Sequence, residues 1–112
     1  MRFLLLICGD QSAAAHAEDG CGGWTQEMVR RGLLPGADGG LATGGLRPPA
    51  EARTVRVRRR RLMLSDGPFA ETKEQVGGFC ILECADMNEA VEAAAAHPAA
   101  SYGTIEVRPM WP

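Results

Sequence analysis

The pattern of hydrophobic and polar positions divides this chain into short elements. Residues Arg2–Cys8 are mainly apolar and are followed by the chain breaker Gly9-Asp10, which predicts a short buried strand. Residues Gly78–Cys84 predict a further strand, in which Phe79, Ile81 and Glu83 lie on one face and Cys80, Leu82 and Cys84 on the other. Thr104–Arg108 predicts the last strand.

A hairpin is predicted in the middle of the chain. Thr54–Arg58 alternates polar and apolar residues with a period of two, so we expect a strand with Val55 and Val57 turned inward. Arg61–Ser65 follows after a short gap, and the two segments together predict a hairpin that turns near Arg59-Arg60.

The clearest helix signal follows Cys84. Asp86 and Glu89 have the spacing of a capping box, which marks a helix N-terminus. His97-Pro98 ends the predicted helix. One helical face carries small or apolar residues, which indicates close packing on a sheet: Met87, Ala90, Val91, Ala94 and Ala95.

The N-terminal half is harder to assign. A short helix is expected over Thr25–Arg31, with its first residue as N-cap, Met28 and Val29 inward, and Gly32 as its stop. A weak strand is expected around Leu41–Thr43, within a glycine-rich stretch.

The predicted order is strand, helix, weak strand, hairpin, strand, helix, strand. Two helices can cover only one face of a mostly antiparallel sheet, so the pattern indicates an α+β two-layer sandwich of ferredoxin-like type, in a single domain spanning residues 1–112. The bare sheet face needs a cover. Because most oligomers are symmetric homodimers, we expect a second copy to supply it.

Composition excludes several classes of protein. The chain has 112 residues, 46% of them hydrophobic, and a formal net charge of −2. No apolar run approaches the roughly 20 residues of a membrane span, so no membrane association is expected. A nucleic-acid binder is usually basic overall. This chain is slightly acidic, so direct nucleic-acid binding is not expected either.

The cysteines, Cys8, Cys21, Cys80 and Cys84, favour no disulfide framework or metal site. The apolar run after Arg2 is shorter than the core of a secretory signal, so we expect a cytoplasmic protein with reduced thiols. Cys80 and Cys84 lie too far apart along one strand to share a metal, and no paired Cys or His motif occurs. Neither a metal nor a cofactor is expected.

Two segments resemble a known family. Asp66–Phe79, which reads DGPFAETKEQVGGF, resembles the defining block of the DGPF proteins within the YCII-related superfamily. The segment His97–Pro109 is similar to the usual ending of that family. Gly45–Pro49 and Thr54–Val57 also fit, so the resemblance covers nearly the whole chain. Arg59-Arg60 departs from the family, in which many members have Asp-Gly.

The resemblance implies a homodimer of the dimeric α/β-barrel type, in which two ferredoxin-like sheets pack face to face. It also implies a link to sigma-factor regulation, because members of the family resemble accessories of extracytoplasmic-function sigma factors. Some relatives in the wider superfamily resemble small-molecule enzymes that use a histidine–aspartate pair.

The Asp66–Glu74 segment is the strongest candidate site. Gly67-Pro68 makes a rigid turn that can hold the Asp66 carboxylate at a set angle, as a binding or acid–base group requires. We predict Asp66 and Glu71 as candidate catalytic residues, with Lys73 and Phe69 as ligand-binding neighbours in a cleft near the dimer interface. The alternative is that Asp66 only caps the turn while the other charges form a solvated ion-pair network.

Two functions remain open. The first is an accessory protein that binds a small ligand or a partner. The second is a lyase or isomerase in which Asp66 or Glu71 transfers a proton and Arg56 or Arg58 anchors an anionic group. The alternative is that Arg56 and Arg58 form the solvated outer face of the hairpin, where polar residues are usual.

The histidines give weaker signals. His97 is expected near a helix C-terminus, where a cation is favourable. His16 lies in an irregular segment near Asp10 and Asp19, and a histidine–aspartate pair there is a further hypothesis.

Overall fold

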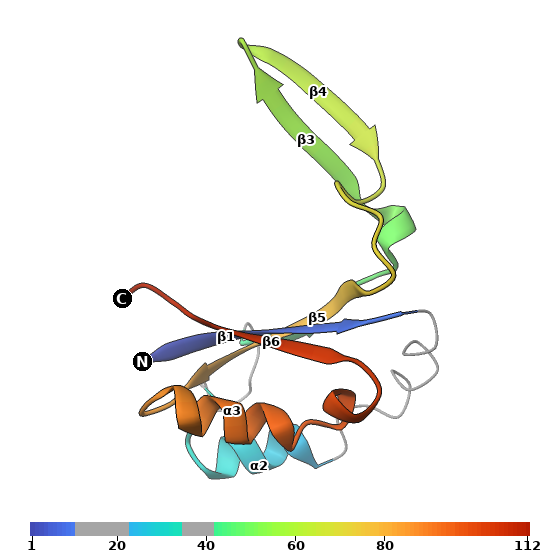
Figure 1. The fold of residues 1–112 in the computed structure, drawn as a ribbon. Coiled ribbons are helices and arrows are strands. Elements are labelled where there is room, and N and C mark those ends of the chain that lie inside the picture. The colour runs from blue at the N-terminus through green and yellow to red at the C-terminus, as the bar shows by residue number, and fades with distance from the viewer. Residues whose placement is uncertain (11–22, 35–41) are drawn as a thin grey trace.

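A computed structural model describes residues 1–10, 23–34 and 42–112. The described residues form two separate antiparallel sheets (Figure 1). Four strands form the larger sheet in the order β2-β5-β1-β6: β1 (Arg2–Gly9), β2 (Thr43–Gly45), β5 (Gln75–Glu83) and β6 (Thr104–Pro109). The other two strands, β3 (Arg53–Arg58) and β4 (Arg61–Asp66), pair only with each other.

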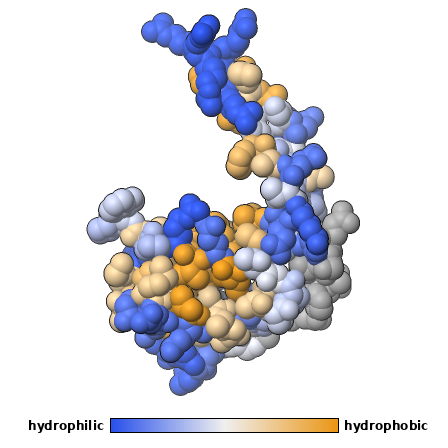
Figure 2. All heavy atoms as spheres, viewed as in Figure 1, coloured by the Kyte–Doolittle hydropathy of each residue, from blue (hydrophilic) through white to orange (hydrophobic). Residues whose placement is uncertain are grey.

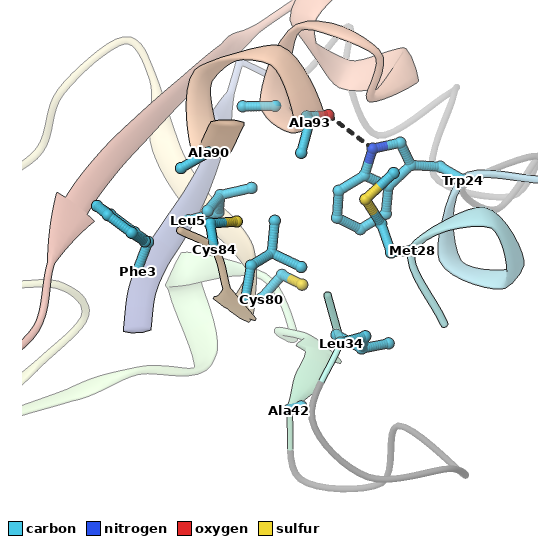
Figure 3. Close-up of a cluster of buried hydrophobic side chains, with 12 residues drawn as sticks. Phe3, Leu5, Trp24, Met28, Leu34, Ala42, Cys80, Cys84, Ala90 and Ala93 are labelled. Atoms are coloured by element: carbon cyan, nitrogen blue, oxygen red, sulfur yellow. Dashed lines mark hydrogen bonds between the residues drawn. The ribbon is translucent and has the colours of Figure 1, made fainter. Parts of the chain in front are cut away.

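Two helices lie on the same face of the larger sheet, α2 (Trp24–Arg30) and α3 (Met87–Ala95) (Figure 1). The hydrophobic core fills the space between them and the sheet (Figure 3). Phe3 and Leu5 of β1 pair with Leu82 and Cys80 of β5, and all four side chains face the helices. The predicted assignment of the Gly78–Cys84 side chains to two faces is therefore confirmed, as is the mixed α+β class with its helices on one face.

Helix α2 differs slightly from its predicted bounds. Its N-cap is Gly23 and not Thr25, because the helix begins at Trp24, whose indole is buried and donates a hydrogen bond of 2.8 Å to the Ala93 carbonyl of α3. The predicted stop at Gly32 is confirmed, since its φ of +72° is a left-handed conformation that glycine adopts at low cost. Met28 is fully buried as expected, whereas Val29 is exposed.

The capping box of α3 is confirmed. The Glu89 backbone N–H donates to the Asp86 carboxylate at 2.9 Å, and the Glu89 carboxylate accepts from the Ala85 N–H at 2.9 Å. The buried face is narrower than predicted, because Met87, Val91 and Ala95 are exposed. Only small side chains reach the sheet: Ala90, Ala93 and Ala94.

The start of β6 packs very closely on β1. After the short 3-10 helix η2 (Pro98–Ser101), Gly103 passes so near β1 that a Cβ atom there would lie 2.3 Å from the Cys8 carbonyl oxygen. A backbone oxygen cannot move aside, so only glycine fits this position.

The hairpin departs most from the sequence-based expectation. Figure 1 shows β3 and β4 projecting beyond the sheet on the side away from the helices, after the 3-10 helix η1 (Pro49–Glu51). Val55 and Val57 are about 60% and 58% exposed, so the prediction that they turn inward is wrong for this chain. The alternation identified the apolar face of the hairpin correctly, but the sheet does not extend beneath that face. We call residues Arg53–Asp66 the arm.

The arm turns where it was predicted to turn. Arg59 and Arg60 form a two-residue connection and have φ of 52° and 62°. Positive φ at both positions is the geometry of a type I′ hairpin turn, which favours Asn-Gly or Asp-Gly. Arginine adopts it at a cost, because its Cβ crowds the following carbonyl.

The larger sheet is open and does not close into a barrel within the chain. We call its helix-free side the open face, and apolar side chains occupy its centre: Leu4, Leu6, Phe79 and Ile81. The predicted weak strand at Leu41–Thr43 is observed as Thr43–Gly45, and Leu41 lies outside the described residues. No helix within the described ranges is long and apolar enough to cross a membrane.

Candidate functional site

The loop of residues 67–74 joins the arm to β5 and contains most of the predicted site. Its first residue, Gly67, has a φ of +87°, a conformation strained for any residue with a Cβ. The Gly67 N–H donates to the Ala52 carbonyl at 2.7 Å, and its carbonyl accepts from the Thr54 hydroxyl at 2.9 Å. These bonds fix the loop to the base of the arm.

Two side chains hold the second half of the loop: Gln75, the first residue of β5, and Glu74. The Gln75 amide donates to the Ala70 carbonyl, the Thr72 carbonyl and the Thr72 hydroxyl at 3.0, 3.2 and 2.9 Å. The Glu74 carboxylate accepts from the Thr104 hydroxyl of β6 at 3.0 Å. The loop is therefore tied both to the arm and to the far edge of the sheet, which gives it a defined shape.

The side chains predicted to act in this loop point outward. Asp66, at the end of β4, has a side chain that is 94% exposed and lies 3.7 Å from the Arg53 guanidinium. Phe69 is 81% exposed, an unusual position for a large aromatic ring. Glu71 and Lys73 are exposed as well. Within one chain these four side chains therefore lie on the surface and do not line a buried pocket.

The predicted arginines lie on the other side of the arm. Asp66 is opposite Arg53 in the register, on the same arm face as Val55 and Val57. Arg56 and Arg58 alternate with those valines and occupy the reverse face. Within a single chain, Asp66 and the two arginines do not converge on a shared site.

The junction of the loop with the sheet contains groups that sequence reasoning did not single out. Cys8 of β1 is opposite Thr104 of β6, near Glu74 and Glu106. Burial raises the pKa of the Cys8 thiol, and the negative charges of Glu106 and Glu74 raise it further. A thiol held in its protonated form is a poor nucleophile. Only the pairing of β1 with β6 brings these residues together, and the sequence carries no local signal for that pairing.

His97 does not act as a cation at a helix end, contrary to the expectation from its position. It is buried, its ring packs edge-on against Trp24 at 4.8 Å between centroids, and its Nδ1 accepts from the Ala99 N–H at 3.0 Å. Burial lowers the pKa of His97. The residue is therefore a neutral cap of η2. His16, the other histidine considered, lies outside the described residues.

A shallow hollow of about 360 Å³ lies between α3 and β6. Its lining is mainly apolar: Val91, Ala94, Ala95, Ala100, Gly103, Thr104, Ile105 and Val107. Figure 2 shows hydrophobic side chains gathered over this part of the body. We call it the α3–β6 hollow. Among the described residues, no three His, Cys, Asp or Glu side chains are placed to hold a metal ion.

Comparison with known proteins assigns the family. The YCII-related domain matches residues 1–112. The chain belongs to the YCII-related family. A curated relative from Rhizobium meliloti (strain 1021), the uncharacterized protein R00369, is 43% identical over 67 residues. The match covers 56% of this chain and 52% of the relative, so the chain spans about half the length of the curated relative it matches.

Membership of the YCII-related family agrees with the resemblance carried by the Asp66–Phe79 block. It leaves the ligand, the partner and the reaction open, because the relative is itself uncharacterized.

Proposed function

We propose that this YCII-related protein is a cytoplasmic homodimer that binds a small ligand or a partner protein through the 67–74 loop. In the proposed dimer, two ferredoxin-like protomers pack their open faces together. The strand order β2-β5-β1-β6 along a strand-helix-strand, strand-helix-strand path supports the ferredoxin-like assignment, with the arm inserted between β2 and β5.

The open face supports the homodimer. Helices cover one side of the sheet, while the other side has an apolar centre bordered by ion pairs: Arg2 with Glu83, and Arg108 with Glu106. An apolar patch rimmed by charges is typical of a protein interface. A self-complementary patch on a small chain is most simply covered by a second copy.

The shape of the 67–74 loop is the observation that carries the binding role. Its backbone carbonyls accept hydrogen bonds from Thr54 and Gln75, and its Glu74 carboxylate accepts one from Thr104. Phe69, Glu71 and Lys73 project from the loop, next to Asp66 at the end of β4. A rigid frame that presents an aromatic ring beside charges of both signs is suited to recognition, since little ordering entropy is lost on binding. A sigma-factor partner is the family-based candidate.

Binding fits the geometry better than proton transfer. The proposed acid–base mechanism needs a carboxylate beside an anchoring arginine, and Asp66 lies on the arm face opposite to Arg56 and Arg58. Asp66 is also highly exposed, so its carboxylate lies in solvent and not in a substrate pocket of the single chain.

Native mass spectrometry of the freshly purified protein tests both parts of this proposal. We expect a dimer with a non-covalent adduct, and we expect Glu71→Gln with Lys73→Met to keep the dimer and lose the adduct. Replacing Leu4 on the open face by glutamine should weaken the dimer, whereas Val29→Gln on α2 should not. A monomer at tens of micromolar would contradict the dimer, and a bare dimer would contradict the small-ligand form of the binding role.

A further inference from the structure

The arm exposes an apolar surface that nothing within the described chain covers. Two cross-strand pairs, Val55 with Leu64 and Val57 with Leu62, lie on one of its faces. All four side chains are 58–61% exposed. Figure 2 shows hydrophobic side chains along the arm below its hydrophilic tip. We call this surface the arm face.

A two-stranded hairpin that stands alone is at best marginally stable in water. At its base, the bonds of Gly67 with Ala52 and Thr54 and the Arg53–Asp66 ion pair join the two ends of the arm to each other, and none of these bonds reaches the larger sheet. Its turn adds a cost, because Arg59 and Arg60 are both left-handed. An arm that is ordered under these conditions needs a surface on which the arm face can pack.

Charge indicates which surface that is. The arm contains six arginines and one carboxylate, whereas the whole chain has a net charge of −2. The remainder of the chain is therefore strongly acidic. Two arms packed together would repel each other, while an arm and the body of a second copy attract. The charge distribution of this chain is thus complementary to itself, arm to body.

The α3–β6 hollow is the matching surface on the body. It is apolar, it lies at the β6 edge of the sheet, and α3 contributes acidic but no basic residues around it. Val91, on its rim, is 49% exposed. A dimer of packed open faces would leave both the hollow and the arm face uncovered.

The geometry of such a dimer brings the two surfaces together. A two-fold axis along the strands places the β2 edge of one protomer over the β6 edge of its partner. The arm leaves the sheet between β2 and β5 and points away from its own helices (Figure 1). Strands of six residues span about 20 Å, which is enough to pass a partner sheet about 10 Å away and reach its helix layer.

We propose that the arm of each protomer docks on the α3–β6 hollow of a second copy, with Leu62 and Leu64 against the partner's Val91. Each chain then gives one arm and receives one, so the contact closes as a symmetric dimer. The proposal rests on the homodimer proposed above and adds a second, separate interface to it. Arg56 and Arg58, on the reverse of the arm, remain in solvent.

Adjacent positions of β4 provide a matched test. Leu62 lies on the arm face and Met63 on the reverse face, and both are exposed in the single chain. We expect Leu62→Gln to raise the dimer dissociation constant at least about tenfold in sedimentation equilibrium, since two buried leucines are lost per dimer. Met63→Gln should change it less than about twofold, as expected for a solvent-facing site. Equal effects of the two variants would overturn the proposal.

The contact with the hollow is tested by a double-mutant cycle. Val91→Gln should weaken the dimer in the same direction as Leu62→Gln. Because the two side chains contact each other across the interface, the double variant should weaken it less than the product of the two single effects. Independent, multiplicative effects would place the arm on some other surface and overturn the proposal.

Hydrogen exchange separates failure of the arm contact from failure of the dimer. We expect amides of 53–66 and 104–109 to gain protection together as protein concentration rises through the dissociation constant. A dimer whose arm exchanges as fast as in the monomer would overturn the arm contact and leave the open-face dimer standing. A chain that is monomeric at every concentration would overturn both.

Discussion

Strands β5 and β3 both place apolar side chains on one face, but the surroundings of those faces differ. Strand β3 alternates apolar with polar residues, whereas β5 is apolar on both faces along Phe79–Leu82. In β5, Cys80 and Leu82 are fully buried beneath the two helices. In β3, Val55 and Val57 stand in solvent. The alternation therefore specifies which side chains share a face, and it does not specify what covers that face.

The difference has an energetic meaning. Burial of an aliphatic side chain contributes roughly 1.5–3 kcal/mol, so the body gains its stability within the chain. The arm gains little of this within the chain, because its apolar side chains stay hydrated. The four large aliphatic residues of the arm face are the ones that the proposed contact with a second copy would cover.

The largest expected effect contrasts a body residue with an arm residue. Leu5→Ala should lower the free energy of unfolding by about 3 kcal/mol, because it leaves a cavity in a fully buried site. Leu62→Ala should lower it by less than about 0.5 kcal/mol at high dilution, since the side chain is already in water. Urea titration followed by the fluorescence of buried Trp24 measures both.

The two variants should also differ in how their free energies of unfolding depend on protein concentration. The cost of Leu62→Ala should grow as dimers form, while the cost of Leu5→Ala should stay nearly constant. A large cost of Leu62→Ala in the monomer would mean that the arm packs on its own body, and the contrast between the two regions would be lost.

Much of the body could be predicted from the sequence because its signals are local. The capping box of Asp86 and Glu89, the stop at Gly32 and the two faces of β5 depend on neighbouring residues only. The detachment of the arm could not be predicted in this way. It depends on β5 pairing with β1 and β2 in place of β4, a choice between distant partners that alternation does not encode.

In the candidate site, too, some features follow from neighbouring residues and others depend on how distant strands pair. The rigid turn at Gly67 follows from a glycine before a proline and was predicted. The exposure of Asp66 and its separation from Arg56 follow from the position of the arm, which the sequence did not reveal. The contact of Glu74 with Thr104 likewise depends on strand order.

A smaller effect is expected at the tip of the arm. Arg60→Gly should stabilise the hairpin by about 1 kcal/mol, because glycine adopts a positive φ without the crowding that an arginine Cβ causes. Amide exchange within residues 53–66 should slow several-fold in the monomer. Exchange of β1 should be unchanged, since the body does not depend on the arm.

Arg58→Gly is the control for this change. It removes one arginine from a strand position and not from the turn, so it should not slow exchange. If both variants slowed exchange equally, charge repulsion at the tip and not backbone strain would be the cause.

The smallest effect at neutral pH is expected at His97, because it appears only on acidification. Burial lowers its pKa in the folded state, so below the unfolded-state pKa of about 6.5 the unfolded chain binds more protons than the folded one. Stability should therefore be full above that pH and fall as the pH is lowered through the folded-state pKa. Protonation at Nδ1 would also remove the acceptor for the Ala99 N–H.

His97→Asn is the matched variant, since an asparagine oxygen can accept the same hydrogen bond at a cap but does not titrate. It should lower stability at all pH values, because ring volume is lost. Below a pH of about 6.5, its free energy of unfolding should fall less steeply with pH than that of the original protein. Urea midpoints of the two proteins across this range give the comparison. A slope that survives in His97→Asn would assign the acid sensitivity to the carboxylates and not to this buried ring.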